Sequence, residues 1–292
     1  MSALLERLDS VGAVAPGATV PGPALHHWTE VPVRRPAPRV VPAPGAEPAP
    51  LACAGALEVR LARGDGDIEA AQRLRWQVFA GELGAALPSQ GGLDHDIFDP
   101  HCEHLVAVDR ASGQVVGTYR LLMPAAARRL GGLYTDSEFD LTRLEALRPR
   151  MVELGRSCVH PDYRSGGVMM LLWSGLGALL ADFELRYLIG CVSVSMEDGG
   201  QRAAGLYRQL EGSRLVDESR RVWPRERLAV ERFGNGPEVA PPPLFKGYLR
   251  AGAVLLGEPH VDTLFDCADF PMMLDLDGLK LRYQRRFRSS GS

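Results

Sequence analysis

Lysine is almost absent from this sequence: of the 33 Lys and Arg residues, only Lys246 and Lys280 are lysines. Nearly every basic contact is therefore made by a planar guanidinium, which can grip a carboxylate or a phosphate through two parallel hydrogen bonds. The formal net charge is only -3 and the isoelectric point is about 6.2. No overall charge attracts nucleic acid, so we expect no nucleic-acid partner.

Cysteine is also scarce, and its pattern excludes a disulfide framework and a zinc site. The five cysteines are odd in number, widely spaced and never arranged as C-x-x-C: Cys53, Cys102, Cys158, Cys191 and Cys267. This pattern is typical of a reduced, cytoplasmic protein. Because Cys158 and Cys191 lie in apolar stretches, we expect inert buried thiols there rather than nucleophiles.

Long hydrophobic runs are missing as well. No segment reaches the roughly 18 to 20 apolar residues that cross a bilayer, and Met1–Val14 lacks the basic start and apolar stretch of a secretory signal. We therefore expect neither a transmembrane segment nor secretion. No internal repeat is present, although 46% of the 292 residues are hydrophobic, enough to bury a core.

The first part of the chain has the composition of a disordered leader. Val14–Leu51 is rich in proline and alanine, and closely spaced prolines remove backbone donors and favour extended, solvated chain. We predict a leader over residues 1–54 and a folded domain over 55–288.

Hydrophobic periodicity predicts an α/β fold with a mixed sheet, because strands and helices alternate along the folded part. The expected strands are 57–61, the two strands of a hairpin over 104–122, 151–159, 187–195 and two final strands in R-R-V-W and L-F-K-G-Y-L. The expected helices are 67–83, 168 to about 184, and 201–211, with one weak helix in the insertion 128–150.

Met151–Met170 is the most informative stretch. An apolar strand carrying Glu153 and Arg156 leads through a breaker cluster, Pro161–Gly167, into a helix start. Charges inside a buried strand cost free energy unless they are paired or used. The free N–H groups at a helix start, with the positive end of its dipole, can hold an anion. We therefore predict a reaction site beside a cofactor phosphate.

The turn H-P-D-Y-R-S-G-G-V contains neither the nucleoside-triphosphate loop nor the dinucleotide fingerprint. It resembles the acyl-CoA pyrophosphate loop, [QR]-x-x-G-x-[GA], of the Gcn5-related N-acetyltransferase superfamily. Arg164 and Gly167 match this pattern, whereas Met169 departs from it, which favours a donor held mainly by its phosphopantetheine arm. The resemblance implies these donor-binding residues: Val159, Arg164, Ser165, Gly166, Gly167 and Val168.

Seven further residues resemble, in identity and order, the charged and aromatic set of the acyl-homoserine lactone synthases, which share that fold: Arg75, Phe79, Asp96, Asp99, Arg120, Glu153 and Arg156. Six segments narrow the resemblance to one family: Phe98–Leu105, Gly155–Arg164, Leu171–Leu176, Pro241–Ala253, Gly257–Asp262 and Ala268–Leu274. Together they resemble the ornithine-lipid N-acyltransferases, once called hemolysin-like proteins, over about Leu57–Arg286.

That resemblance implies a mixed, mostly antiparallel sheet flanked by helices, with a family-specific C-terminal extension. It also implies transfer of a 3-hydroxyacyl chain from acyl carrier protein or acyl-CoA to the α-amino group of ornithine, with no tightly bound cofactor. The residues leave glycine, lysine and glutamine open as acceptors. Alternatives are a synthase of acyl-homoserine lactones, an acetyltransferase for another small amine, and a non-catalytic acyl-carrier-binding module.

An amine attacks a thioester only as the neutral base, so the site must take up a proton and accommodate an oxyanion. Glu153 is the candidate base or organiser of a basic water; a structural ion pair with an arginine is the alternative. Residues three apart on one strand point to opposite faces unless a bulge intervenes. Contact between Glu153 and Arg156 therefore depends on strand geometry, and a bulge would also free a backbone N–H for the thioester oxygen.

We expect the acceptor amino acid to bind beside Phe79, at the four other charged residues of this set: Arg75, Asp96, Asp99 and Arg120. Asp96 and Asp99 could hold its cationic end or simply cap turns, and Arg75 and Arg120 suit its carboxylate. A metal site of these aspartates with His95, His101 and His104 is a weaker alternative, because one loop seldom closes a site; we predict no metal.

Tyr207 lies where many superfamily members place the tyrosine that protonates the leaving thiolate, although a tyrosine on an amphipathic helix also suits a core. No nucleophile elbow is present, so we expect no acyl-enzyme. Arginines could dock an acidic carrier protein or touch the membrane surface transiently: Arg128, Arg129, Arg143, Arg148, Arg150, Arg282, Arg285, Arg286 and Arg288.

Overall fold

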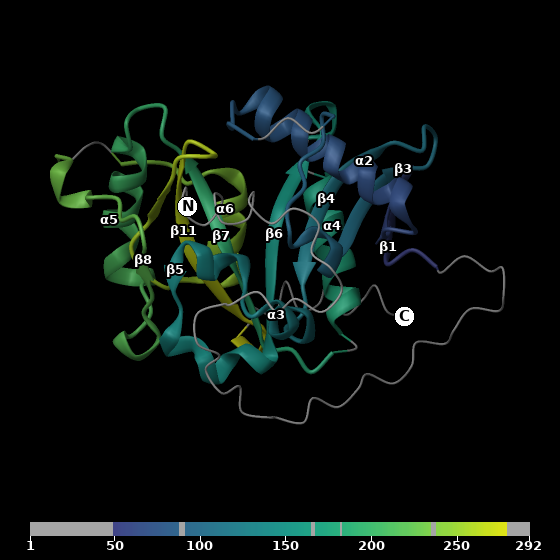
Figure 1. Cartoon of the computed structure of the whole chain (residues 1–292). Helices are drawn as coiled ribbons and strands as arrows, with labels where there is room; N and C mark the ends of the chain where they lie inside the picture. The colour runs from purple at the N-terminus through teal and green to yellow at the C-terminus, as the bar shows by residue number, and fades with distance from the viewer. Residues whose placement is uncertain (1–48, 88–90, 165–166, 182, 235–237, 279–292) are drawn as a thin grey trace, which may run out of the picture.

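The computed structural model describes residues 49–87, 91–164, 167–181, 183–234 and 238–278 (Figure 1). The predicted leader lies outside these residues except at its end. There β1 (Ala52–Ala54) pairs with β2 (Leu57–Leu61), so the sheet begins inside the segment predicted as leader. Ser165, Gly166 and the four C-terminal arginines of the predicted docking face also lie outside.

A mixed sheet organises the described chain, as predicted. Its order is β1-β2-β3-β4-β6-β7-β11-β10, with β9 paired to β11. Every neighbouring pair is antiparallel except β6 with β7. The remaining strands of this sheet are β3 (Glu103–Asp109), β4 (Val115–Leu122), β6 (Met151–Val159), β7 (Tyr187–Ser195), β9 (Val254–Leu255), β10 (His260–Asp262) and β11 (Cys267–Asp275). The predicted hairpin, and the strands at 57–61, 151–159 and 187–195, are confirmed.

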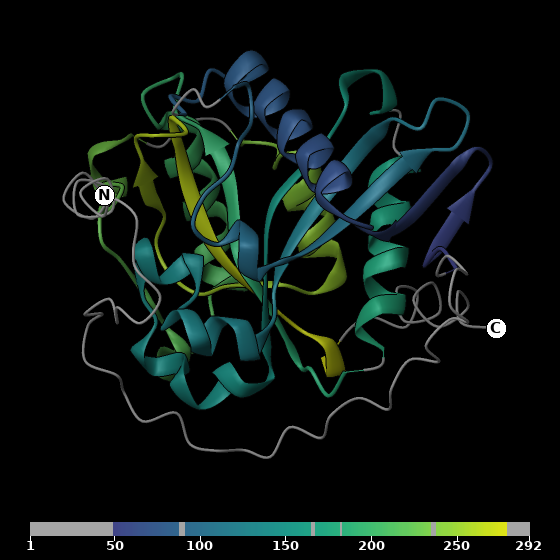
Figure 2. The same cartoon turned by 45° about the vertical axis from the view of Figure 1, so that its right-hand side comes forward.

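Two helices cover opposite faces of the first half of the sheet (Figures 1 and 2). Along β3, Leu105 and Ala107 pack with α4 (Gly167–Leu180), whereas Val106 and Val108 pack with α2 (Asp65–Trp76). This alternation follows from the two-residue period of a strand whose faces are both buried. The predicted helix 67–83 starts two residues earlier and continues as a π-helix over Gln77–Glu82.

A smaller layer packs on the other half of the sheet. It contains α3 (Pro124–Leu130), 3-10 turns over Tyr134–Ser137 and Thr142–Arg150, and a two-stranded ribbon of β5 (Phe139–Asp140) and β8 (Trp223–Pro224). The predicted strand in R-R-V-W is thus a two-residue piece outside the main sheet. The helix predicted at 201–211 is α5 (Gln201–Arg214).

The predicted strand in L-F-K-G-Y-L is wrong, because this segment forms the helix α6 (Pro243–Ala251). Proline at the first helical position needs no N–H partner, and the left-handed Gly252 ends the helix. The strand that the sequence analysis missed, β11, contains Pro271. On the outer side of β11, Pro271 lies between the residues paired with β10 and those paired with β9, where no ladder requires its missing N–H.

The parallel strands β6 and β7 separate partway along their length. They pair only from Met151–Tyr187 to Glu153–Ile189, and beyond that point they diverge (Figure 1). Gly190 marks the split, since a Cβ there would lie 2.3 Å from the carbonyl oxygen of Leu154. Because the two strands do not pair beyond this point, N–H and C=O groups on their facing edges can bond a ligand instead. No helix among the described residues is long and apolar enough to span a membrane.

Candidate active site

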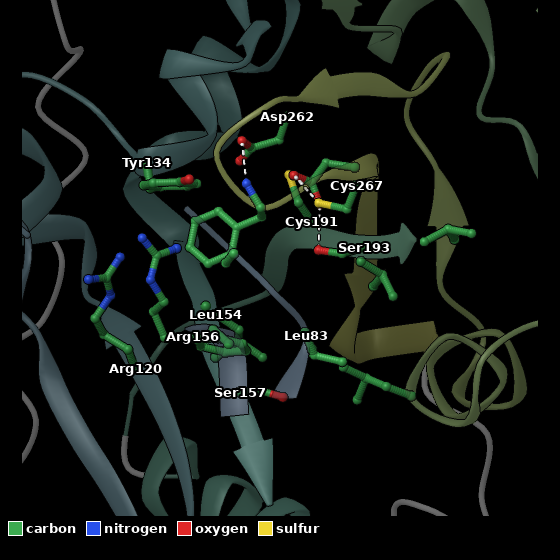
Figure 3. Close-up of a pocket in the computed structure, with 18 of the residues that line it drawn as sticks. Leu83, Arg120, Tyr134, Leu154, Arg156, Ser157, Cys191, Ser193, Asp262 and Cys267 are labelled. Atoms are coloured by element: carbon green, nitrogen blue, oxygen red, sulfur yellow. Dashed lines mark hydrogen bonds between the residues drawn. The ribbon is translucent and has the colours of Figure 1, made fainter. Parts of the chain in front are cut away.

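A cavity of about 490 Å³ fills the opening between β6 and β7 (Figure 3). Residues 154–157 of β6 and 191–195 of β7 form its walls. Apolar side chains from distant segments line one part of it: Phe79, Leu83, Ala85, Leu244, Tyr248 and Phe265. Of the predicted site residues, Phe79, Arg120, Glu153 and Arg156 line this cavity.

The bulge on which the sequence analysis depended is present at Arg156. Along β4 and β6, Thr118 pairs with Cys158 and Arg120 with Gly155, so Tyr119 lies opposite two residues of β6. Arg156 adopts the left-handed conformation, with φ of 49°, which is uncommon for a residue other than glycine, asparagine or aspartate. Residues three apart on a regular strand point to opposite faces, and the extra residue of the bulge brings Glu153 and Arg156 to the same face. Both residues line the cavity.

Glu153 is almost fully buried, and its carboxylate bonds the 3-10 turn rather than an arginine. Oε2 accepts from the Tyr134 N–H at 2.7 Å, and Oε1 accepts from the Thr135 N–H at 2.7 Å and its hydroxyl at 2.5 Å. Burial raises the pKa of Glu153, and these hydrogen bonds oppose the rise. The alternative role, a structural ion pair with Arg75, Arg120 or Arg156, is not formed among the described residues. A carboxylate has about four acceptor positions, so Oε2 can still accept one more hydrogen.

Three arginines and three aspartates form an alternating ring of ion pairs: Arg75, Asp94, Arg156, Asp96, Arg120 and Asp99, closing back on Arg75. The six N···O distances lie between 2.6 and 3.2 Å. The arginines come from α2, β4 and β6, whereas all three aspartates belong to one loop. The ring is formally neutral, so it fixes this loop against three elements without leaving an excess charge.

This ring changes the roles expected for the acceptor-binding residues. Arg75 is fully buried and does not line the cavity, so it is not placed to take a carboxylate. Asp96 accepts from the N–H groups of Phe98 and Asp99, and Asp99 accepts from the Asp96 N–H. Burial would raise the pKa of Asp99, but the charges of Arg75 and Arg120 outweigh it and lower that pKa. Asp96 and Asp99 therefore cap the turn and pair with arginines, and they do not form an open site for the acceptor.

Tyr207 is not brought to the cavity. It lies on the buried face of α5 with Ala203, Ala204 and Leu206, within the main core, and burial raises its pKa to about 12. The tyrosines that line the cavity are Tyr119, Tyr134 and Tyr248. An amphipathic helix pattern does not distinguish a core tyrosine from a catalytic one, and here the core alternative is what the structure shows.

The predicted donor loop lies past the cavity, where β6 ends. Arg164 donates to the Val159 carbonyl at 3.0 Å and pairs with both carboxylate oxygens of Glu82. Val168 is buried against Gly117, whose Cβ, if present, would lie 2.7 Å from a Val168 methyl. Gly167 begins α4 and is exposed, with no atom within 4 Å of where its Cβ would be. The helix start is therefore accessible, while the Val168 side chain serves the core.

The alternative metal site in the loop is not formed, because its aspartates are occupied by arginines. His104 is buried and bonds the Asp99 carbonyl at 3.0 Å. The one group of metal-compatible side chains in the described chain is instead Asp262, Cys267 and Asp269.

These acids at the cavity wall were not among the residues predicted from the sequence. Asp262 and Asp269 are buried and line the cavity, and Glu138 is buried close to them. Burial raises the pKa of Asp269 to about 6, although the Ser193 hydroxyl donates to it at 2.6 Å. The signal was available: Asp269 is a charge inside the apolar stretch 267–274, as Glu153 is within its own strand.

All five cysteines are free thiols. Burial raises the pKa of Cys158 to about 12 and that of Cys191 well above its usual range. A thiol with a raised pKa stays protonated and is a poor nucleophile. The prediction of inert thiols therefore agrees with their surroundings, although Cys191 and Cys267 line the cavity.

Comparison with known proteins identifies relatives. Residues 74–174 match the family model described as an acetyltransferase (GNAT) domain. An L-ornithine N(alpha)-acyltransferase of Rhodobacter capsulatus is 36% identical over 251 residues, covering 80% of this chain and 97% of that protein. One from Brucella abortus is 35% identical, covering 78% and 88%.

Among solved structures, a CoA-dependent acyl-homoserine lactone synthase, BjaI, with SAM and isopentyl-CoA aligns with a TM-score of 0.46 and 16% identity, over 77% of this chain and 83% of that one. The long alignments with curated relatives decide the family. This chain is an acyltransferase with a GNAT domain and belongs to the L-ornithine N(alpha)-acyltransferase family.

Proposed function

We propose that the protein transfers a 3-hydroxyacyl chain from a thioester to the α-amino group of ornithine, producing lyso-ornithine lipid. The observation that carries the proposal is the bulged strand at the open split between β6 and β7, in a chain whose relatives at 35–36% identity are named for acylating ornithine. In this reaction the amine nitrogen bonds to the thioester carbonyl carbon, the C–S bond breaks, and the thiolate takes up a proton.

The split would supply the electrostatics for this step. Beyond Glu153, β6 has no ladder with β7, so N–H groups of β6 on that side could donate to the oxyanion that develops on the thioester oxygen. The left-handed Arg156 turns the backbone locally and sets the direction of the adjacent N–H groups. Donors fixed in this way need no reorganisation when the charge develops.

Glu153 is our candidate for the proton acceptor, either directly or through a water. Its Oε2 retains one acceptor position, and its raised pKa brings its basicity closer to neutral pH than that of an ordinary carboxylate. Arg120 remains a candidate for binding the acceptor's α-carboxylate, and Arg156, which also lines the cavity, takes the place of Arg75. Binding there requires the carboxylate to share guanidiniums already paired with aspartates.

The donor's acyl chain would lie along the apolar wall formed by Phe79, Leu83 and Leu244. Its phosphate would lie near the start of α4, where Gly167 is exposed and helix N–H groups are free. Arg164 is paired with Glu82, so a phosphate that used this guanidinium would compete with a carboxylate. Both acyl carrier protein and acyl-CoA present such a phosphate on a phosphopantetheine arm.

An acidic carrier protein would dock on fewer arginines than the sequence indicated. Arg148 is buried and paired with Asp136 and Glu145, and Arg143 stacks on Trp223. Arg128 and Arg129, in the last turn of α3, are exposed, as is Arg150. We propose these three for carrier docking and for transient contact with an anionic membrane surface.

Incubation of the full-length protein with acyl-carrier and acyl-CoA donors and a panel of amino acids tests the proposal. Mass spectrometry should detect an N-acyl product whose mass equals that of ornithine plus the transferred acyl group minus one hydrogen, with 3-hydroxyacyl donors favoured. The same protein heated to denaturation serves as the control. Absence of any N-acyl amino acid with every donor and acceptor pair would show that the proposed function is wrong.

A further inference from the structure

The charges around the cavity do not balance. On one side, Arg120 and Arg156 belong to the ring in which three arginines meet three aspartates. Elsewhere on the wall, Asp262 and Asp269 lie with Glu138 close behind them, and in the described chain none of these carboxyls forms an ion pair with an arginine or a lysine. Figure 3 shows Asp262 above Tyr134 and beside Cys267, away from Leu83 and Ser157 at the other end.

Parts of these carboxyls are buried without a partner. The Oδ2 oxygen of Asp262 has no hydrogen-bond donor, although the residue is only 1% exposed, and the equally buried Glu138 has only the Cys191 thiol and the Tyr134 hydroxyl near its oxygens. The other oxygen of Asp262 accepts from the N–H groups of Leu264 and Phe265, which orients the carboxyl. A buried acceptor left unsatisfied costs about 1 to 3 kcal/mol. An acceptor that is unsatisfied in the free protein is expected where a ligand supplies the missing hydrogen-bond donor.

The surroundings favour an ammonium group over a metal ion. The third metal-compatible atom is the Cys267 thiol, and burial raises its pKa, so it stays protonated and is a poor ligand. The aromatic rings of Tyr134 and Phe265 also line this cavity, and ring faces attract organic cations. Three donors of one ammonium match several carboxylate oxygens at hydrogen-bonding distance.

We propose that Asp262 and Asp269, with Glu138 packed behind them, form the subsite that binds the distal ammonium of a diamino acid acceptor and thereby selects it over neutral amino acids. The inference rests on the proposed function. It assigns acceptor recognition to β10, β11 and the turn before β5, rather than to Asp96 and Asp99. Ornithine's α-carboxylate would then lie toward Arg120 and Arg156, and its α-amine at the split.

The test compares ornithine with norvaline, which has the same carbon chain without the distal amine. A site built around a polar substituent rejects the analogue that lacks it, so wild-type kcat/KM should favour ornithine by at least about 100-fold. In Asp262→Asn and Asp269→Asn that ratio should fall about tenfold or more, mainly through a higher KM for ornithine. Glu211→Gln, an exposed carboxyl on α5, is the matched control and should keep the wild-type ratio.

Calorimetric titration of ornithine and norvaline into the wild-type protein, without donor, gives a second measurement that does not depend on variants folding. Tighter binding of ornithine supports the subsite. Equal binding of both ligands overturns it, as does an unchanged ratio in both variants while ornithine is still acylated. Loss of discrimination after chelation with EDTA would also overturn it, in favour of a metal. Failure of the wild type to acylate any amino acid contradicts the proposed function alone, because the titration still tests the subsite.

Discussion

At the scale of single residues, two buried carboxyls that line the cavity, Glu153 and Asp262, illustrate different uses of burial. Glu153 accepts three hydrogen bonds, which involve both of its oxygens, whereas the Oδ2 oxygen of Asp262 accepts none. The first arrangement stabilises an anion beside the reaction centre. The second leaves acceptors free for a cation.

Replacing Glu153 tests its role as proton acceptor. We expect Glu153→Gln to lower kcat by about 100-fold or more, the usual contribution of a general base. A base works only when deprotonated, so wild-type rate should rise with pH through the pKa of Glu153, which is raised from 4.5, and the variant should lose this acidic limb. The measurement is a pH profile of kcat.

Thr135→Ala is the comparison, because it removes one hydrogen bond to Glu153 and keeps the carboxyl. It should retain the acidic limb. Unchanged turnover of Glu153→Gln would show that this residue only anchors the turn.

Asp269 should reduce the stability of the free protein. Its folded pKa of about 6 is raised from 3.8, so the folded state holds this proton more tightly than the unfolded chain does. Stability from this group is therefore present below pH 3.8 and lost as pH rises through about 6. We expect Asp269→Asn to stabilise the protein by about 2 to 3 kcal/mol at pH 7, and to bring little gain at pH 4.

Urea denaturation at both pH values measures this difference. Asparagine keeps an acceptor for the Ser193 hydroxyl, so the comparison isolates the charge. A variant that is less stable than wild type at pH 7 would contradict the assignment. If Asp269→Asn both stabilises the protein and weakens ornithine binding, the Asp269 carboxylate serves binding at the expense of folding stability, as is usual for a functional site.

At the scale of elements, the sequence predicted the strands and helices whose pattern is periodic and locally encoded. Met151–Val159 and Tyr187–Ser195 are mostly apolar stretches of strand length, and the structure has strands over the same bounds. α6 and β11 were not predicted, because the effect of a proline on a helix or a strand depends on its position in that element and on its neighbours. Pro243 begins a helix, and Pro271 is tolerated in a strand because its partners on one side are discontinuous.

The candidate site could be predicted only where it depends on one segment. Glu153 and Arg156 share a strand, and the need for a bulge between them followed from strand periodicity. The ring that closes on Arg75 unites residues up to 81 positions apart, from Arg75 to Arg156, and no local pattern encodes which aspartate meets which arginine. Asp262 was overlooked because its significance depends on a cavity formed by distant strands.

The split between β6 and β7 should depend on Gly190. A methyl group there would meet the Leu154 carbonyl, which is backbone and cannot rotate away. We expect Gly190→Ala to destabilise the protein by about 1 to 3 kcal/mol and to lower activity by shifting the strand that carries Glu153. Thermal unfolding and kcat/KM together check this.

Gly212→Ala is the matched control, because nothing lies within 4 Å of a Cβ there and the position is helical. It should stabilise the protein by about 0.5 to 1 kcal/mol. Equal behaviour of the two variants would mean that the close approach at Gly190 is unimportant.

At the scale of the whole molecule, the exposed arginines of α3 offer a way to separate the two donors. We expect Arg128→Glu with Arg129→Glu to lower kcat/KM for acyl carrier protein about tenfold, and less at high salt, because rim charges act mainly on association. The rate with acyl-CoA should hardly change. Steady-state kinetics at two salt concentrations measures the effect.

Arg232→Glu, a charge reversal at another exposed arginine, should leave both donors unaffected. An equal loss with acyl-CoA and with acyl carrier protein would indicate that α3 affects the fold or the cavity rather than docking.

The six-membered ring of ion pairs also constrains how such a protein can diverge. Removing one partner of a buried pair leaves the other charge uncompensated, at about 3 to 5 kcal/mol, and each member of this ring has two partners. A single substitution therefore removes one partner from each of two neighbours and leaves one excess charge, whereas replacing one arginine and one neighbouring aspartate together by apolar residues keeps the ring neutral. We expect these six positions to change together across descendants, and rarely one at a time.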